Sequence, residues 1–402
     1  MKIAIFSDYF YPELGGIQDS IIALSKELGR MGHRVDFYVP KSSARDFKVS
    51  GFPEKEIELG ENVHVHRLFS FSYPSPTAQS RIFIPSGLVA RLLKDSKPDV
   101  IHTNTFLGLG LEAILDAKLL KIPIVRTNHL PVTDYSYLIP LNQKMVKKYS
   151  LKYVCWYYNQ CNFVTGPSES VFTDMNQSGF KTPYRAISNP IDIRTFTPID
   201  PSVSKSSLKS KWNLSPHTIV FAGRITSEKK IDVLIRAVAD IKKSIPDIVL
   251  AVAGHGDKEA DFKSLAVQLG VSDNVRFVGT LKREDLVDLY RASEIFTIAS
   301  VCETQGLVMM QAMACALPIV GVSARALPEY INDKNGVMVE PEDHAAIAEK
   351  VISLLGDEAR MSLLGQGGFE YVKQFAPEII AQEWINIYNK TIALKRGLTS
   401  YT

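Results

Sequence analysis

The sequence predicts an α/β protein with two doubly wound parallel sheets, one in each half of the chain. Both halves alternate short apolar runs, typical of buried strands, with longer amphipathic segments, typical of helices. At 402 residues the chain is too long for one hydrophobic core and suits two domains of ordinary size. With 46% hydrophobic and 22% charged residues, its composition is that of a globular protein.

In the first half, the expected strands are apolar runs that stop at polar or turn residues. They cover residues 3–6, 35–39, 99–102, 124–125 and 162–165. Helices are expected over residues 17–31 and 109–120, where the apolar positions do not alternate as they would in a strand. Because strands and helices alternate, the sheet should be parallel.

The second half repeats the scheme. Its expected strands cover residues 219–222, 249–253, 275–278, 295–299 and 319–320. The intervening helices include residues 232–244 and 284–292, and a final helix covers residues 377–395. The proline- and serine-rich segment over residues 190–216 indicates a linker. We therefore expect an N-terminal domain (1–190), a C-terminal domain (191–375) and a C-terminal helix (376–402) that crosses back to the first domain.

Composition also restricts the function classes. The net charge of +3 is too small to indicate nucleic-acid binding. The four cysteines form no C-x-x-C pair and have no histidine at zinc spacing, so free thiols in a reducing compartment are expected. The N-terminus has no signal-peptide pattern, and no apolar stretch is long enough to span a membrane. We expect a cytoplasmic protein, either free or peripheral on the cytoplasmic face of the membrane.

The strongest motif follows the expected strand 218–222. The strand stops at Gly223, Arg224 and Lys229 come next, and a helical pattern starts at Ile231. A strand, a tight turn and a helix with cations at its start form a site for a bound phosphate. The alternative is an ordinary solvated helix start. Cations at a helix N-terminus interact unfavourably with the helix dipole, by roughly 0.3–1 kcal/mol. A bound anion would offset this cost, so the cations favour the phosphate site.

A second motif, Glu303-Thr304-Gln305-Gly306, lies eighty residues on and leads into an apolar helix from Leu307. It follows a strand, so it lies at the carboxyl edge of the sheet, where α/β proteins bind ligands. Glu303 could instead be a favourable charge at a helix N-terminus. Cations for a pyrophosphate and a carboxylate for a polyol together suit a nucleotide-sugar.

Three further features carry less weight. Gly15-Gly16 precedes the first helix, where a phosphate can approach the backbone, although an ordinary turn has the same sequence. His129 follows a strand of the first domain, but a lone histidine is more often structural. The run Gly108-x-Gly110-x-x-Ala113 matches a dinucleotide fingerprint. It is not at the first turn and no acidic residue ends the next strand, so close packing of a helix on a sheet explains it better.

These motifs together resemble the family-four retaining glycosyltransferases with the GT-B fold, in which two Rossmann-like domains face a cleft. The likeness covers nearly the whole chain, including Ser188-Asn189-Pro190, Asn335-Gly336 and the motifs above. One departure is clear, because Gln311 stands where the family pattern has a second glutamate. The Glu-Thr-Gln-Gly form is most similar to the diacylglycerol glucosyltransferases.

The resemblance implies a role for each motif residue. Arg224, Lys229, Gly16, Leu307 and Val308 would hold the donor phosphates, and His129 and Glu303 would be catalytic. Thr304, Gln305 and Gly306 would contact the sugar, and Leu281 and Gln311 the nucleoside. The N-terminal domain would bind the acceptor and the C-terminal domain a UDP- or GDP-linked sugar. No metal or other cofactor is implied.

The sequence leaves the partners open in part. The acceptor would be a lipid such as diacylglycerol or another hydroxyl compound, and no nucleic acid is expected. Two rival functions share the fold: epimerisation of a nucleotide-sugar, and a nucleotide-sugar-binding pseudoenzyme that acts as a regulatory partner, suggested by Gln311. The first lacks the observed combination of Arg, Lys and Glu-x-Gln-Gly.

One helix also indicates a membrane contact. Its lysines recur every fourth residue beside a stripe of apolar and aromatic residues, with Tyr157 and Tyr158 nearby. The two stripes are Lys144, Lys148 and Lys152, and Met145, Tyr149, Tyr153 and Trp156. Such a helix can lie in an anionic membrane interface. It can equally pack its aromatic side into the domain with its lysines in water.

Overall fold

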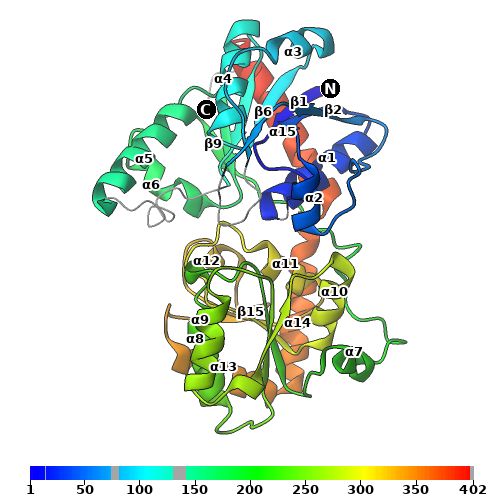
Figure 1. The fold of residues 1–402 in the computed structure, drawn as a ribbon, viewed down its shortest axis with the longest axis vertical. Helices are drawn as coiled ribbons and strands as arrows, with labels where there is room; N and C mark the ends of the chain where they lie inside the picture. Colours follow the sequence, from blue (N-terminus) through cyan, green and yellow to red (C-terminus); the bar gives the residue numbers. More distant parts are fainter. Residues whose placement is uncertain (14, 74–80, 130–141, 399–402) are drawn as a thin grey trace. The chain divides into compact units, whose positions relative to one another are not determined.

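The computed structural model describes residues 1–13, 15–73, 81–129 and 142–398 (Figure 1). The chain divides into two compact units. Unit 1 comprises Met1–Pro190 and Pro377–Thr402, and unit 2 comprises Ile191–Ala376. None of the described helices is long and apolar enough to cross a bilayer. Each of the four cysteines is a buried free thiol.

Unit 1 is built on a parallel sheet with the strand order β3-β2-β1-β6-β7-β8-β9. Its strands are β1 (Lys2–Phe6), β2 (Arg34–Pro40), β3 (Val63–Leu68), β6 (Val100–Thr103), β7 (Ile124–Thr127), β8 (Phe163–Gly166) and β9 (Tyr184–Ala186). The central strands are apolar along their length because helices cover both faces of a parallel sheet. Ile3 to Phe6, for example, are all fully buried. A two-stranded antiparallel sheet, β4 (Phe71–Ser72) and β5 (Arg81–Ile82), is separate.

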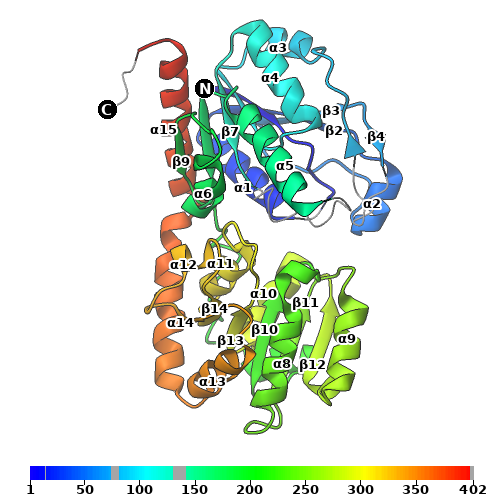
Figure 2. The same ribbon diagram turned by 90° about the vertical axis from the view of Figure 1, so that its left-hand side faces the viewer.

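The helices of unit 1 follow the strands in the order expected for crossover connections. They are α1 (Gly16–Arg30), α2 (Ala44–Ser50), α3 (Ala90–Ser96), α4 (Gly108–Leu120), α5 (Gln143–Tyr158), α6 (Thr173–Asn176) and α15 (Pro377–Lys395). Helix α15 lies along one side of unit 1 (Figure 2), where it packs against α1, β6 and β7 and where its Glu383 lies 3.6 Å from Arg185 of β9. The His102 ring of β6 stacks on Trp384 of α15 at a centroid distance of 4.4 Å, and its Nδ1 lies 2.9 Å from the Tyr388 hydroxyl. The last helix of the chain therefore completes the core of unit 1.

Unit 2 contains a second parallel sheet, with the order β12-β11-β10-β13-β14-β15. Its strands are β10 (Thr218–Ala222), β11 (Val249–Ala253), β12 (Val275–Gly279), β13 (Ile295–Ile298), β14 (Ile319–Val322) and β15 (Gly336–Val339). Its helices are α7 (Lys205–Trp212), α8 (Ile231–Ile241), α9 (Glu259–Gln268), α10 (Arg283–Ala292), α11 (Leu307–Ala314), α12 (Leu327–Tyr330), α13 (His344–Leu355) and α14 (Glu358–Val372).

The predicted fold class, two Rossmann-like parallel-sheet domains, is confirmed. The linker was predicted too broadly, because residues 191–216 belong to unit 2 and include helix α7. The edge strands β3, β9 and β15 were not predicted. Each is polar or contains glycine, since an edge strand is only partly buried and need not be apolar throughout.

The glycines at the start of α4 serve close packing. A Cβ atom at Gly110 would collide with the Thr105 carbonyl group, and one at Gly108 would lie 2.5 Å from Asp8 Oδ1. Only glycine allows the helix to approach the loop this closely. The dinucleotide-like fingerprint is thus a packing motif.

Glu112 on α4 is fully buried and accepts three backbone hydrogen bonds. The N–H groups of Ser86, Gly87 and Val89 donate to its carboxylate at 2.6, 2.8 and 3.1 Å. These bonds fix the segment that leads into α3, whose N–H groups would otherwise lack partners.

Replacing Glu112 by glutamine should lower the free energy of unfolding by about 3 kcal/mol. The glutamine side chain lacks the negative charge, and its NH2 group would face the backbone N–H donors. Hydrogen bonds to a charged group contribute roughly 1.5–3 kcal/mol each. Urea denaturation measures the change. Glu61→Gln, at an exposed glutamate of the same unit, is the control and should be nearly neutral. Equal effects of the two substitutions would contradict the anchoring role.

Candidate functional site

The two motifs of unit 2 follow neighbouring strands at the point where the strand order reverses. β10 pairs with β11 on one side and with β13 on the other. The loop after β10 carries Arg224 and Lys229, and the loop after β13 carries Glu303. In doubly wound sheets, ligands bind at the carboxyl ends of the strands at such a switch point. The topology therefore brings the two motifs to one edge of the sheet.

Lys229 and Glu303 are in direct contact. Lys229 Nζ lies 2.6 Å from Glu303 Oε1, and each side chain is only 12% exposed. Residues separated by 74 positions thus form one ion pair in a largely dry environment, where electrostatic interactions are stronger than in water. The cation predicted to bind a phosphate and the carboxylate predicted to bind hydroxyl groups therefore lie side by side.

Arg224 lies on the solvent side of the same loop. Its side chain is 54% exposed, and its Nη2 is 3.4 Å from Oε1 of the buried Glu228. The Glu228 carbonyl oxygen accepts the N–H of Val301 at 3.2 Å, which ties this loop to the end of β13. Arg224 can therefore turn toward a ligand while the loop that carries it stays anchored.

The loop after β11 supports the loop after β10 from the other side. Gly223 donates its N–H to the carbonyl of Ala253, and Ile225 donates to that of His255. Gly254 has φ +136°, and a Cβ atom there would collide with the Gly223 carbonyl group. Gly254 is therefore required by this close approach.

The start of α11 supplies backbone donors. Gly306 precedes the helix in the left-handed conformation, with φ +78°. It follows Thr304, which is partly buried, and Gln305, which is 1% exposed. Leu307 and Val308 open the helix, and the first N–H groups of a helix have no partner within it. They suit an anion.

Leu281 and Gln311 occupy two separate elements of unit 2. Leu281 comes just after β12 and packs on the core of the unit, and Gln311 is a partly buried residue of α11. Gly254 N–H donates to the carbonyl of Gly279 at 2.8 Å, so the end of β12 is tied to the supporting loop. Their nucleoside role stays a prediction.

Two of the predicted catalytic and phosphate-binding residues belong to unit 1. Gly16 is exposed at the start of α1. His129 is buried just after β7, and its Nε2 lies 2.9 Å from Asn104 Oδ1. Burial, together with the Arg126 cation, lowers the pKa of His129 to about 3. Its imidazole is therefore neutral at physiological pH.

Arg126 is an unexpected feature of unit 1. It is 1% exposed, and its guanidinium lies 5.3–5.8 Å from the ring centroids of Phe106, Tyr157 and Tyr158. These rings stabilise the buried cation. Tyr157 and Tyr158, expected near the membrane stripe, are instead core residues.

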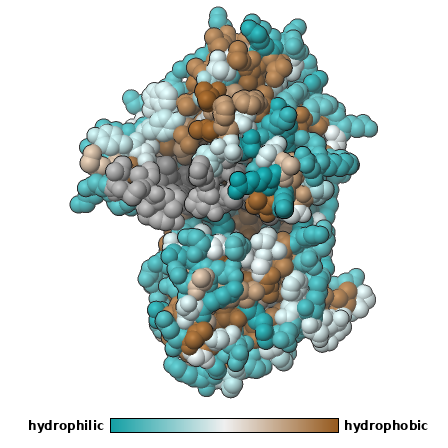
Figure 3. Space-filling model, in the orientation of Figure 1, coloured by the Kyte–Doolittle hydropathy of each residue, from teal (hydrophilic) through white to brown (hydrophobic). Residues whose placement is uncertain are grey.

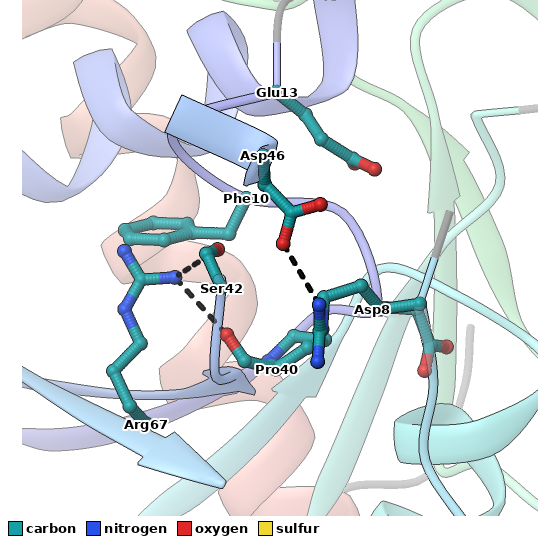
Figure 4. A pocket seen from close by; sticks show the side chains of 8 residues that line it. Asp8, Phe10, Glu13, Pro40, Ser42, Asp46 and Arg67 are labelled. Atoms are coloured by element: carbon teal, nitrogen blue, oxygen red, sulfur yellow. Dashed lines mark hydrogen bonds and ion pairs between the residues drawn. The ribbon is translucent and has the colours of Figure 1, made fainter. Parts of the chain in front are cut away.

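A small polar pocket lies at the carboxyl ends of β1, β2 and β3 (Figure 4). Arg67 donates to the Pro40 carbonyl and to Ser42, and Asp46 accepts from Arg81 at 2.8 Å. Burial raises the pKa of Glu13, which also lines this pocket, to about 8. Glu13 is therefore mainly protonated at neutral pH, and sequence patterns gave no sign of this.

Helix α5 presents both predicted stripes in part. Lys144, Lys148 and Lys152 are exposed. Met145, Tyr149 and Trp156 are also exposed, by 51–58%, whereas Tyr153 is half-buried and donates to the Phe106 carbonyl. The helix thus combines exposed lysines with exposed apolar side chains.

Across the described ranges, no group of three or more His, Cys, Asp or Glu side chains is arranged to hold a metal ion. Arg224 and Lys229 place two cations at the unit 2 edge described above.

Two family profiles match the chain. The profile described as "Glycosyltransferase Family 4" matches residues 14–195, and "Glycosyl transferases group 1" matches residues 203–370. An alpha-monoglucosyldiacylglycerol synthase from Streptococcus pneumoniae is 29% identical over 342 residues, 83% of this chain and 74% of that protein. A synthase of the same name from Acholeplasma laidlawii is 23% identical over 398 residues, 96% of each chain.

A solved structure agrees with the fold. Anabaena HepE, in complex with UDP and glucose, has a TM-score of 0.75 and 18% identity, and the match covers 97% of this chain and 99% of that chain. At this identity the likeness shows the fold alone.

Proposed function

Because the chain belongs to the family-four glycosyltransferases with the GT-B fold, which act on nucleotide-sugars, we propose that it moves a hexose from a UDP-sugar to a lipid hydroxyl with retention of configuration. The observation that carries the proposal is the Lys229–Glu303 ion pair at the switch point of the unit 2 sheet. It supports the proposal because the cation proposed to bind phosphate and the carboxylate proposed to bind hydroxyl groups are in contact there.

In the proposed reaction, Lys229 and Arg224 neutralise the departing diphosphate. Fixed cations at a leaving group supply the electrostatic stabilisation that usually dominates catalysis, so no metal is required. Glu303 accepts hydrogen bonds from sugar hydroxyls, and the N–H groups of Leu307 and Val308 hold phosphate oxygens. The acceptor attacks from the face that the diphosphate leaves, which retains the configuration.

The remaining predicted residues keep the roles that the family resemblance gives them. Gly16 lets a phosphate approach the backbone, and His129 acts in sugar transfer as a neutral ring. Thr304, Gln305 and Gly306 bind the sugar. Leu281 borders the base, and Gln311 hydrogen-bonds the ribose as a neutral amide.

Diacylglycerol is the proposed acceptor. Two relatives are named for a glucosylated diacylglycerol. Unit 1 also has an apolar surface: in Figure 3, hydrophobic residues gather over α3 and α4. Leu92 on α3 and Leu115 and Leu119 on α4 are exposed by 41–66%. Such a surface, together with the exposed lysines of α5, suits an enzyme that takes its acceptor from a bilayer.

Activity with defined substrates tests the proposal. The full chain is incubated with UDP-glucose, UDP-galactose and GDP-mannose, each with and without diacylglycerol in mixed micelles. We expect a glycolipid with one UDP-sugar, and proton NMR of its anomeric centre should report the α configuration of the donor. Release of an epimer without acceptor would support the epimerase instead. Nucleotide binding without any turnover would support the pseudoenzyme.

Membrane binding is expected to depend on the lysines of α5. Each lysine near an anionic surface contributes about 1 kcal/mol, so changing Lys144, Lys148 and Lys152 to glutamate should abolish sedimentation with phosphatidylglycerol vesicles at low salt. The control carries the same charge change at Lys243, Lys263 and Lys334, exposed lysines of unit 2. If wild type stays in the supernatant at low salt, the membrane contact is wrong.

A further inference from the structure

Asn104 and His129 form a buried hydrogen bond between neighbouring strand ends of unit 1. Asn104 follows β6, and His129 lies two residues beyond β7, which pairs with β6. His129 Nε2 is 2.9 Å from Asn104 Oδ1, and the two residues are 8% and 2% exposed. The bond therefore fixes the ring from the side of the sheet.

The Asn104 side chain contributes little to the stability of the fold. Its Nδ2 is buried and has no hydrogen-bond partner within the described part of the chain. A buried donor without a partner destabilises the fold. Asn128, the residue before His129, differs: its Nδ2 donates to the Val171 carbonyl and its Oδ1 accepts from the Tyr158 hydroxyl. The amide of Asn104 is half satisfied, and the bond that it makes is to His129.

The bond also determines which ring nitrogen of His129 carries the proton. If Oδ1 of Asn104 accepts, the proton is on Nε2, and Nδ1 carries a lone pair. Among the described residues, Nδ1 of His129 has no hydrogen-bond partner. The charged and titratable groups that act on this ring and its neighbours are Arg126 on β7, His102 on β6 and Asp8 after β1. Burial lowers the pKa of His102 as well, so both rings are neutral.

We propose that Asn104 is a positioning residue, which holds His129 in the Nε2–H tautomer so that Nδ1 accepts a hydrogen bond from a substrate hydroxyl. This inference rests on the proposed function, because it requires His129 to act in sugar transfer. An amide is suited to the task, since it orients the ring without adding a charge that would protonate it.

The tautomer is measured directly, by long-range ¹H–¹⁵N NMR on the full chain labelled at histidine. The His129 signal is assigned by its absence in His129→Ala. Wild type should show the proton on Nε2, and Asn104→Ala should show a mixture of tautomers. An Nδ1–H tautomer in wild type would overturn the proposal, whether or not the variant folds.

Kinetics provide the second readout. Asn104→Ala should lower kcat about tenfold with little change in the KM of the donor, the effect of losing one orienting hydrogen bond. Asn104→Asp should raise the pKa of His129, because a carboxylate stabilises the imidazolium. Its kcat should therefore be low at acid pH and recover as pH rises through that pKa, while wild type shows no such step.

Asn162→Asp is the matched control for the added charge. Its side-chain oxygen accepts the Ile124 N–H at 3.0 Å, which a carboxylate oxygen can also do. This variant should keep the pH profile of wild type, and a profile like that of Asn104→Asp would overturn the proposal. The two hypotheses can be tested separately. An active His129→Ala variant would contradict the role of His129 in transfer and, with it, the role of Asn104. An inactive His129→Ala variant together with the Nδ1–H tautomer in wild type would contradict the role of Asn104 alone.

Discussion

Replacing Lys229 by alanine should weaken the binding of a nucleoside diphosphate tens-fold. Replacing Glu303 by alanine should abolish most turnover, while the affinity for the nucleoside diphosphate changes little. A charge-assisted contact to a phosphate contributes roughly 1.5–3 kcal/mol, which sets the first effect. Glu303 is expected to contact the sugar, so its loss should appear mainly in kcat. Calorimetry with UDP and steady-state kinetics separate the two.

The neighbouring lysine provides a matched control. Lys230 forms its own ion pair, 2.6 Å from Glu342, which is 63% exposed. Lys230→Ala removes a cation and an ion pair one position along the chain and should leave UDP affinity within about twofold, because exposed pairs contribute little. Equal losses in both variants would mean that general charge, and not the Lys229 position, determines binding.

Because Lys229 and Glu303 touch, their effects on stability should not add. Each single variant leaves a largely buried partner unpaired, whereas the double variant removes both charges. We expect the double variant to be more stable than the sum of the two single losses implies. Strict additivity would indicate that the pair does not form in solution.

Gly254→Ala should disrupt donor binding although the residue carries no chemistry. Its Cβ atom would collide with the Gly223 carbonyl, so the loops after β10 and β11 must separate. Overpacking of this kind costs about 1–3 kcal/mol, and the positive φ adds strain. We expect a lower melting temperature, UDP affinity reduced at least tenfold and turnover reduced further.

Gly356→Ala is the control for this substitution. A Cβ atom there would make only ordinary contacts, at 3.5 and 3.7 Å, and φ is −85°. This variant should bind UDP as wild type does. If Gly254→Ala binds UDP normally, the loop after β11 does not set the position of Arg224 and Lys229.

The central part of the fold could be predicted because its signals are local. The strand before Gly223 and the helix from Ile231 are apolar runs of the lengths that strands and helices require. The strand order then determines that the loops of Arg224 and Glu303 are neighbours, which a resemblance to known motifs anticipates. The sequence does not contain the 2.6 Å contact itself.

Features that depend on distant neighbours could not be predicted. The requirement for glycine at position 254 comes from a carbonyl group 31 residues earlier. Arg126 looks like a surface cation in the sequence but is buried among aromatic rings, two of them contributed by Tyr157 and Tyr158. The sequence places those tyrosines beside the aromatic stripe of a helix, but it does not show that their rings enter the core.

The place of α15 in unit 1 has a consequence for how the chain matures on the ribosome. Unit 2 is one continuous stretch, Ile191–Ala376, whereas unit 1 needs the last helix to cover His102. At about 5–20 residues per second, roughly 10–40 s pass between synthesis of the last strand of unit 1 and that of α15. The second unit is therefore the first to have its full sequence. During this interval we expect the nascent first unit to expose the apolar surface that α15 later covers.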